Sequence, residues 1–446
     1  MTTAPRSLLA AFVLPLLLPT CSFSESPAAC ADAGSGWCLA RRITGDVPGG
    51  ELGFRFGEPL DVDGDRAADI AAGTRFKMLG GVRQNGGASI WSGRTGKKIR
   101  EWEGEHTDGL MGHWVLAVPD VSGDRLADVV VAAPNARVGL DVGTGIVSAR
   151  SPRTGKQIWT RGGGRLGQFG WDLSPAGDHN GDGVADIFAG APSQDSGRAY
   201  LLSGKDGAVL QTYAPMADTG SFGWYVARLD DLDRDGRPDV GIGAYKEPGT
   251  SGARIGAAYV FSAATGQQLR TWKGSTPSSG FGEVIASLGD INQDGVGEIV
   301  VGSPRSEDKS RLMPGEVFVY SGADGTELRR WKGKQPEELY GRMVYSAGDV
   351  DGDRIDDLVI GAPWHRQNFV AKVGRVEIRS GRTGEVLHEM FGELGEAWFG
   401  WHIRRAPDPD GWGRPALLIG SLRYPVQAKA GTGVLDLWVL RKPEGR

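Results

Sequence analysis

The sequence predicts an all-β fold, a seven-bladed β-propeller with four strands in each blade. Three observations predict it: an acidic nine-residue loop recurs at nearly fixed spacing, short apolar runs follow each copy, and helical periodicity is missing after the N-terminus. Successive full loops are 59, 58, 53, 59 and 59 residues apart and begin at Asp61, Asp120, Asp178, Asp231, Asp290 and Asp349. A fixed period of this length indicates an array of one supersecondary unit.

Each unit opens nine residues ahead of its loop with a large apolar residue and a glycine. These pairs are Leu52-Gly53, Met111-Gly112, Phe169-Gly170, Phe222-Gly223, Phe281-Gly282, Tyr340-Gly341 and Phe399-Gly400. After the loop come an apolar run such as DVVVAAP (from Asp128), a second run such as GEVFVYSG (from Gly315) and a last run ending near Trp-x-Gly. Runs of β-branched and aromatic residues bounded by Gly, Pro and Asp are typical of strands. Because they are apolar on both faces, the sheets are expected to be covered on both sides.

The two ends of the repeat region predict how the ring closes. A degenerate seventh copy begins at Asp408 and ends with one strand, Val434 to Leu440, without a fourth. The segment Leu39 to Gly45 resembles the fourth strands of the other copies, so we expect it to complete the last blade. Residues 37–446 are therefore predicted to be a single propeller without open sheet edges.

Residues 1–31 are predicted to be a signal peptide or a lipoprotein leader, because Arg6 precedes the apolar run LLAAFVLPLLLP. Cleavage is expected between residues 20 and 31. In the lipoprotein alternative Cys21 carries the lipid anchor. Either way the protein is expected to be exported, secreted or associated with the cell envelope. Cys30 and Cys38 are predicted to form a disulfide, unless Cys30 leaves with the leader and Cys38 keeps its thiol.

The acidic loops predict metal binding. Each places oxygen-bearing side chains at positions 1, 3, 5 and 9 of a tight turn, where they converge on one point. Hard Ca²⁺ prefers six to eight oxygen ligands in irregular geometry. Up to six structural Ca²⁺ sites are thus predicted. Their ligands are Asp61, Asp63, Asp65 and Asp69; Asp120, Ser122, Asp124 and Asp128; Asp178, Asn180, Asp182 and Asp186; Asp231, Asp233, Asp235 and Asp239; Asp290, Asn292, Asp294 and Glu298; and Asp349, Asp351, Asp353 and Asp357.

Details of the loops refine this prediction. Every full loop has glycine at position 4 or 6, which a sharp turn requires. The second set is the weakest because Ser122 brings no charge. The seventh loop has Trp412 and Ala416 at ligand positions, so we expect no metal there. The loops are not EF-hands, because position 12 falls within a strand and no helices flank them.

These motifs resemble the FG-GAP repeat, the unit of the integrin α-chain propeller and of many exported bacterial proteins. Phe169-Gly170, the loop DHNGDGVAD and Gly190-Ala191-Pro192 form a full copy of the pattern, and the resemblance covers residues 52–440. It implies a seven-bladed propeller with calcium in blade loops on one face and ligand recognition on the other. Family members include adhesion receptors, lectin-like proteins and accessory domains of enzymes.

The face opposite the metal loops is predicted to be basic. The seven segments 74–87, 134–145, 192–197, 244–256, 304–315, 363–374 and 421–433 sum to +8, with Arg75, Lys77 and Arg83 in the first, whereas the whole chain is −5. Aromatic residues accompany them at Phe76, Trp364, His365, Phe369 and Tyr424. This rim favours an anionic partner, such as an acidic glycan or a surface protein. The alternative is that the basic residues only solubilise long loops. The negative net charge disfavours nucleic acid.

The sequence favours a non-catalytic binding or adhesion module over an enzyme. It has neither H-E-x-x-H nor G-x-S-x-G, and His106, His113, His179, His365, His388 and His402 are interpreted as surface or loop residues. One alternative is the propeller scaffold of an extracellular polysaccharide-acting enzyme with an acidic central pocket. The other is a quinoprotein-like dehydrogenase, suggested by TGKQIWTRGG at Thr154. Seven copies instead of eight and the calcium loops argue against it.

Overall fold

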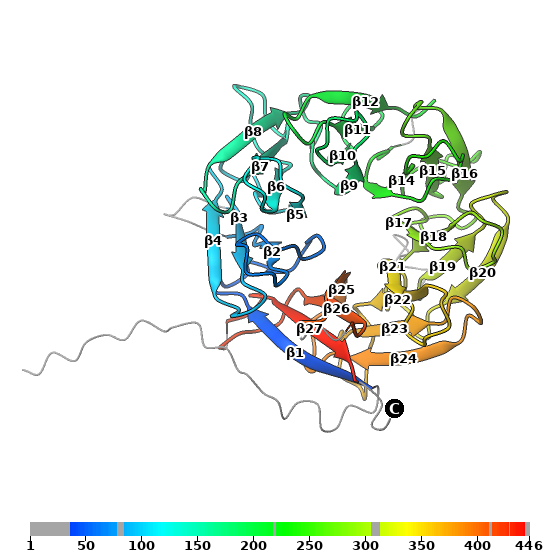
Figure 1. Cartoon of the computed structure of the whole chain (residues 1–446). Helices are drawn as coiled ribbons and strands as arrows, with labels where there is room; N and C mark the ends of the chain where they lie inside the picture. The colour runs from blue at the N-terminus through cyan, green and yellow to red at the C-terminus, as the bar shows by residue number, and fades with distance from the viewer. Residues whose placement is uncertain are drawn as a thin grey trace, which may run out of the picture.

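The computed structural model describes residues 36–77, 84–216, 220–304, 313–409, 413–427 and 429–441. Seven antiparallel sheets stand in a ring around a central axis (Figure 1). In that part of the chain all regular elements are strands, and no helix is long and apolar enough to cross a membrane. The predicted seven-bladed β-propeller is thus confirmed.

Each blade is one sheet whose strands follow chain order from the axis outward, except that β1 is the outermost strand of blade 7. Blades 1 to 3 consist of β2 (Ile70–Gly73), β3 (Gly87–Trp91), β4 (Lys98–Glu103); β5 (Trp114–Val118), β6 (Asp128–Ala133), β7 (Ile146–Arg150), β8 (Gln157–Gly162); and β9 (Leu173–Gly177), β10 (Asp186–Ala191), β11 (Arg198–Leu202), β12 (Val209–Tyr213). Blades 4 and 5 consist of β13 (Tyr225–Arg228), β14 (Val240–Ala244), β15 (Ala257–Phe261), β16 (Gln268–Lys273); and β17 (Val284–Leu288), β18 (Glu298–Ser303), β19 (Glu316–Tyr320), β20 (Glu327–Lys332). Blades 6 and 7 consist of β21 (Met343–Gly348), β22 (Asp357–Ala362), β23 (Arg375–Arg379), β24 (Val386–Phe391); and β25 (Phe399–Ala406), β26 (Ala416–Ser421), β27 (Val434–Leu440), β1 (Trp37–Thr44).

The N-terminal strand closes the ring as predicted. β1 pairs antiparallel with β27, with Arg42 opposite Asp436 and Ile43 opposite Leu435 (Figure 1). The Arg42 guanidinium lies 2.7 Å from the Asp436 carboxylate, which is buried. Because the two ends of the chain share one sheet, blade 7 cannot separate from blade 1 without breaking this pairing.

The core lies between neighbouring blades. The second strands, such as β6, are buried along their whole length, whereas outer strands such as β4 are mostly exposed or half-buried. Outer tryptophans join adjacent blades: Trp102, Trp159 and Trp272 donate indole N–H bonds to turn carbonyls of the next blade. These tryptophans therefore tie their outer strands to the neighbouring blades.

Blade 1 departs from the common pattern. Its innermost segment forms only isolated bridges, from Phe56 to Ala72 and from Leu60 to Asp69. The backbone N–H of Gly57 bonds instead to the carbonyl of Val115 in blade 2. This segment therefore leans against the neighbouring blade, and its sheet keeps three regular strands.

Candidate functional site

Each acidic loop connects the innermost strand or segment of a blade to its second strand. Positions 4 and 6 of all six loops have φ between 63° and 88°. In five loops one of these two positions is not glycine but Arg66, Arg125, Arg234, Gln293 or Arg354. A long side chain in the left-handed region is strained, so the surrounding hydrogen bonds must hold the turn.

The carboxylates themselves supply those hydrogen bonds, as the first loop illustrates. Asp61 accepts from the backbone N–H groups of Gly64 (2.7 Å) and Arg66 (2.9 Å). Asp63 Oδ1 accepts from the N–H of Asp65 at 3.0 Å. These hydrogen bonds hold the turn, and each carboxylate keeps lone pairs that can coordinate a cation.

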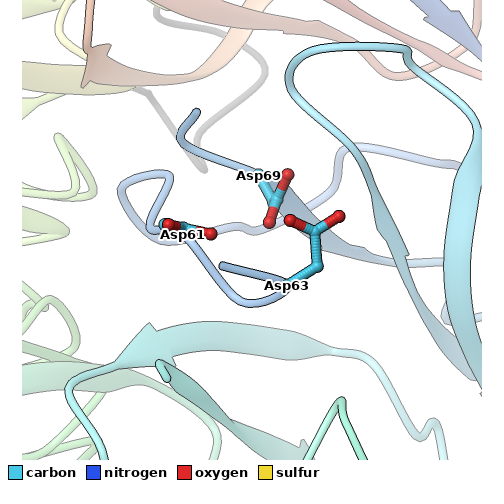
Figure 2. A group of neighbouring side chains, drawn as sticks. All are labelled: Asp61, Asp63 and Asp69. Atoms are coloured by element: carbon cyan, nitrogen blue, oxygen red, sulfur yellow. The ribbon is translucent and has the colours of Figure 1, made fainter. Parts of the chain in front are cut away.

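Four loops bring three acidic side chains to one point, with ligand atoms within 4.8 Å of one another. Figure 2 shows this for the first loop, where Asp61, Asp63 and Asp69 surround a common space. The four groups are Asp61, Asp63 and Asp69; Asp231, Asp233 and Asp239; Asp290, Asp294 and Glu298; and Asp349, Asp351 and Asp353.

The position-9 carboxylate lies at the base of each loop and is buried. One oxygen accepts the N–H of position 2, as between Asp69 and Val62 at 2.9 Å. Within the described chain, Asp239 Oδ1 and Glu298 Oε1 are buried without a hydrogen-bond partner. Burial raises the pKa of Asp239 and Glu298 to about 7, and the other acids of each loop add to the rise.

Unpartnered buried carboxylate oxygens are costly unless something else coordinates them. A hard divalent cation supplies that partner and offsets the repulsion among the acids. The donor set is all oxygen and irregular in geometry, and it therefore fits Ca²⁺.

The remaining predicted ligands are placed less uniformly. Loops 2 and 3, with Ser122 and Asn180 at position 3, form no group of three close acids among the described residues. Asp65 pairs with Arg94 and Asp353 with Arg382, at 2.9 and 2.7 Å, so an arginine competes with a cation in loops 1 and 6. In the seventh loop Arg414 binds the carboxylate of Asp408 at 2.8 Å, in keeping with the expectation of no metal there.

The loops between second and third strands lie at the opposite end of the blades, because adjacent strands are antiparallel. The basic rim expected there needs correction. Lys77 is buried and pairs with Glu101 at 2.5 Å, and His365 is buried against Glu338. Arg83 lies outside the described residues. Arg75 pairs with Glu51 at 2.8 Å, with its guanidinium 3.3 Å from the centre of the Phe54 ring.

The same face carries a feature that the sequence reading missed. The residue after each apolar-glycine pair points to the axis, and together Phe54, His113, Trp171, Trp224, Glu283, Arg342 and Trp401 form what we call the axial ring. Neighbours contact one another: ring centroids lie 4.6 to 6.0 Å apart from Trp224 round to Trp401, and Arg342 stands 4.2 Å from the centre of the Trp401 ring. The sequence signal for this ring is the residue at the third position of every repeat, directly after the apolar-glycine pair.

The histidines were predicted to be surface or loop residues, and for His402 this is wrong, because it is buried in strand β25. His113, His179 and His365 do lie in loops or turns, although their side chains are buried as well. His113 stacks between Phe54 and Trp171, and the Nε2 of His402 lies 3.0 Å from the carbonyl of Phe56. They serve as core aromatic residues because they fall at axial or blade-contact positions.

The fold and the loops together define a β-propeller with an acidic turn at the root of most blades. The FG-GAP repeat family matches residues 169–202 and 346–376. Among curated relatives, integrin alpha-8 of Gallus gallus is 28% identical over 204 residues, 42% of this chain and 19% of its own length. Integrin alpha-2 of Mus musculus is 32% identical over 198 residues, 41% of this chain and 16% of its own.

A solved structure, BBS1N in complex with ARL6DN soaked with lead, is similar in fold with a TM-score of 0.56 and 11% identity. It covers 92% of this chain and 99% of its own, and at that identity it bears on the fold alone. The chain spans less than a fifth of the length of the integrin relatives. The chain thus carries FG-GAP repeats on a seven-bladed propeller that is similar to the N-terminal propeller of integrin α chains.

Proposed function

We propose that this protein is an exported, calcium-stabilised binding module that recognises a surface or matrix protein through the face opposite its metal loops. The observation that carries the proposal is a set of apolar side chains at the loop tips of that face. Leu140 (99% exposed) lies between β6 and β7, and Phe369 (fully exposed) lies between β22 and β23. Val138 and Val142 are exposed on either side of Leu140, and Val370 is exposed next to Phe369, so each tip presents a group of apolar side chains. Grouped apolar residues in solvent mark interaction sites.

Charge on that face supports an acidic contact region in the partner. Lys246 stands over Tyr245, Lys372 over Trp364 and Arg423 over Trp398, at 4.4 to 5.2 Å from the ring centres. Lys372 also pairs with Glu396 at 3.0 Å and Arg423 with Glu51 at 3.7 Å, so Lys246 is the cation of the three that is best placed to meet a carboxylate of a partner. The resemblance to integrin α chains supports a protein partner over the alternative, an anionic glycan.

Calcium is proposed to hold the binding face in shape. The carboxylate at the base of a loop also contacts the turn between the third and fourth strands of its blade, as where Asp69 accepts the N–H of Gly93 at 2.9 Å. Because this carboxylate is also a proposed ligand, up to six bound ions would link the loops to these turns. Export by the leader, with Cys21 as a possible lipid anchor, is part of the same proposal. Both the leader and Cys30 lie outside the described residues, and the disulfide from Cys30 to buried Cys38 remains a prediction.

The test is a binding screen of residues 32–446 on arrays of surface proteins and glycans, with calcium and with chelator. We expect a protein ligand whose binding is lost with chelator. A Leu140→Ser, Phe369→Ser double variant should then weaken binding, whereas Leu328→Ser, half-exposed on outer strand β20, should not. No binding in either buffer, or equal effects of both variants, would contradict the proposal.

The enzyme alternative gains no support from the axial cavity. It predicts an acid-lined central pocket. The cavity on the axis carries Arg228, Arg404 and Arg405 beside its three carboxylates.

A further inference from the structure

The propeller axis contains a cavity of about 550 Å³ at the metal-loop end. Its wall comes from all seven blades, with Glu58 from blade 1, Trp114 from blade 2 and Arg404 from blade 7 among its residues. At the other end the axial ring narrows the channel, since Phe54, His113, Glu283 and Arg342 there are buried. The cavity therefore has the form of a pocket that opens beside the metal loops.

Two arginines and one carboxylate gather at the floor of this pocket, around Trp114, and Arg55 and Asp172 stand just behind the lining residues. Asp172 is buried, and its oxygens accept from Arg55 (2.8 Å), Trp114 Nε1 (2.5 Å) and the N–H of Val226 (2.8 Å). These three donors satisfy the carboxylate, and its charge balances that of Arg55.

Arg404 is a second buried guanidinium at the same floor. It donates to the carbonyl of Ile403 at 2.9 Å and stands 4.6 Å from the centre of the Tyr345 ring and 5.5 Å from that of Trp114. Among the described residues it forms no ion pair within 4.0 Å; the Tyr225 hydroxyl hydrogen-bonds it, and the Asp172 carboxylate, already paired with Arg55, attracts it from a greater distance. A buried charge without an ionic partner is unusual in a folded protein.

The groups near the mouth are polar, with three carboxylates and two arginines, so the whole lining is balanced in charge once Arg404 is included. Glu58 accepts from Tyr345 at 2.9 Å, Asp230 from Ser287 at 2.7 Å and Asp356 from Ser346 at 2.7 Å. Arg228 and Arg405 lie on the same wall. His402, packed beside Arg404, has its pKa lowered well below the usual value by burial and by the nearby arginines, so it stays neutral.

We propose that the axial cavity binds a small carboxylate-bearing ligand, whose carboxylate pairs with Arg404 and whose hydroxyl or amino groups meet Glu58, Asp230 and Asp356. The planar guanidinium fork matches a carboxylate, and burial strengthens the pair. The volume suits a small-molecule site with a few converging polar groups. A sugar acid and an α-amino acid share this chemistry. The site is separate from the face proposed for a protein partner.

The experiment titrates the full mature chain in calcium buffer with glucuronate, glutamate and glucose, followed by calorimetry. Saturable binding of glucuronate or glutamate, without binding of glucose, is expected. Glucuronate alone identifies a sugar-acid site, glutamate alone an amino-acid site, and both a site that reads mainly the carboxylate. The proposal is overturned if neither acid binds, or if glucose binds as tightly as the acids.

Variants locate the site. Arg404→Met should weaken binding about tenfold or more, because a charge-assisted pair is lost. Ala117→Phe should do the same by filling the cavity, since Ala117 lines it and Arg404 is left in place. Arg161→Met, on the exposed part of outer strand β8, is the matched control. If Arg404→Met does not fold, Ala117→Phe decides: wild-type affinity in that variant refutes the cavity as the site.

Discussion

Replacing Asp239 by Asn tests the metal loops most directly. Asp239 is 0% exposed at the base of the fourth loop, close to Asp231 and Asp233. Its Oδ2 accepts the N–H of Leu232 at 2.9 Å, a bond that the amide oxygen of Asn can keep. The substitution therefore removes one charge and one ligand oxygen while it preserves the shape of the turn.

The expected magnitude depends on calcium. With free calcium at ten times the dissociation constant, loss of one site lowers the free energy of unfolding by about 1.4 kcal/mol. With chelator, the wild-type carboxylate is disfavoured by burial and by Asp233 and Asp235, which is why its pKa rises to about 7. The same substitution is then neutral or stabilising. The variant should therefore be less stable than the wild type with calcium, and as stable as the wild type or more stable with chelator.

The assay is urea unfolding followed by tryptophan fluorescence, with calcium and with chelator. Asp195→Asn serves as control, because its exposed side chain lies outside the acidic loops. An equal loss of stability in both buffers would mean that Asp239 stabilises the loop only by accepting the backbone N–H of Leu232. Unfolding midpoints that are the same with and without calcium would refute the structural role of the metal.

Three further predictions concern the ring. His113→Phe should be neutral or stabilising at pH 7, because both imidazole nitrogens are buried without partners in the described chain. Burial and the nearby Arg75 and Arg55 lower the pKa of His113. The contribution of neutral His113 to the free energy of unfolding is therefore fully present above about pH 6.5, and it falls by up to about 1.4 kcal/mol per pH unit below that. Denaturant unfolding at pH 7 and pH 5 should show less acid sensitivity in the variant; an unchanged slope would contradict this. Trp159→Phe should cost about 1–3 kcal/mol in the same assay, because its indole N–H bonds Gly204 of the next blade at 2.7 Å, and no loss would mean that this bond is dispensable. Arg42→Ala should cost about 3–5 kcal/mol by leaving Asp436 buried and unpaired, measured by thermal unfolding and amide exchange in β1; protection of β1 equal to wild type would argue against it.

Much of the fold followed from local chemistry. The loop acids and glycines, with a constant spacing, predicted the blades, and the missing fourth strand predicted that β1 completes blade 7. The recurring glycines have a physical reason, because the backbones of neighbouring blades approach closely. A Cβ on Gly190 would lie 2.1 Å from the carbonyl oxygen of Gly223 in the next blade. Such requirements are local or repeat at a fixed period, so one sequence displays them.

Charge on the opposite face could not be counted from the sequence. Lys77 and His365 fall in the segments that predicted a basic, partly aromatic rim, yet Lys77 is buried in an ion pair with Glu101 and His365 is buried in a hydrogen bond with Glu338. Those partners lie 24 and 27 residues away, on other elements. Exposure is a property of the packed blade.

The sequence by itself determined the number of blades, the turn chemistry of the acidic loops and the way the ring closes, because each is written in residues that lie close together or recur. Only the tertiary structure decided what meets on the axis. The axial ring takes one residue from each blade, and Arg55, Asp172 and Arg404, from blades 1, 3 and 7, gather around Trp114 at the inner end of the pocket. Residues so far apart in the chain become neighbours only when the ring closes, and closure sets which of their charges remain unpaired.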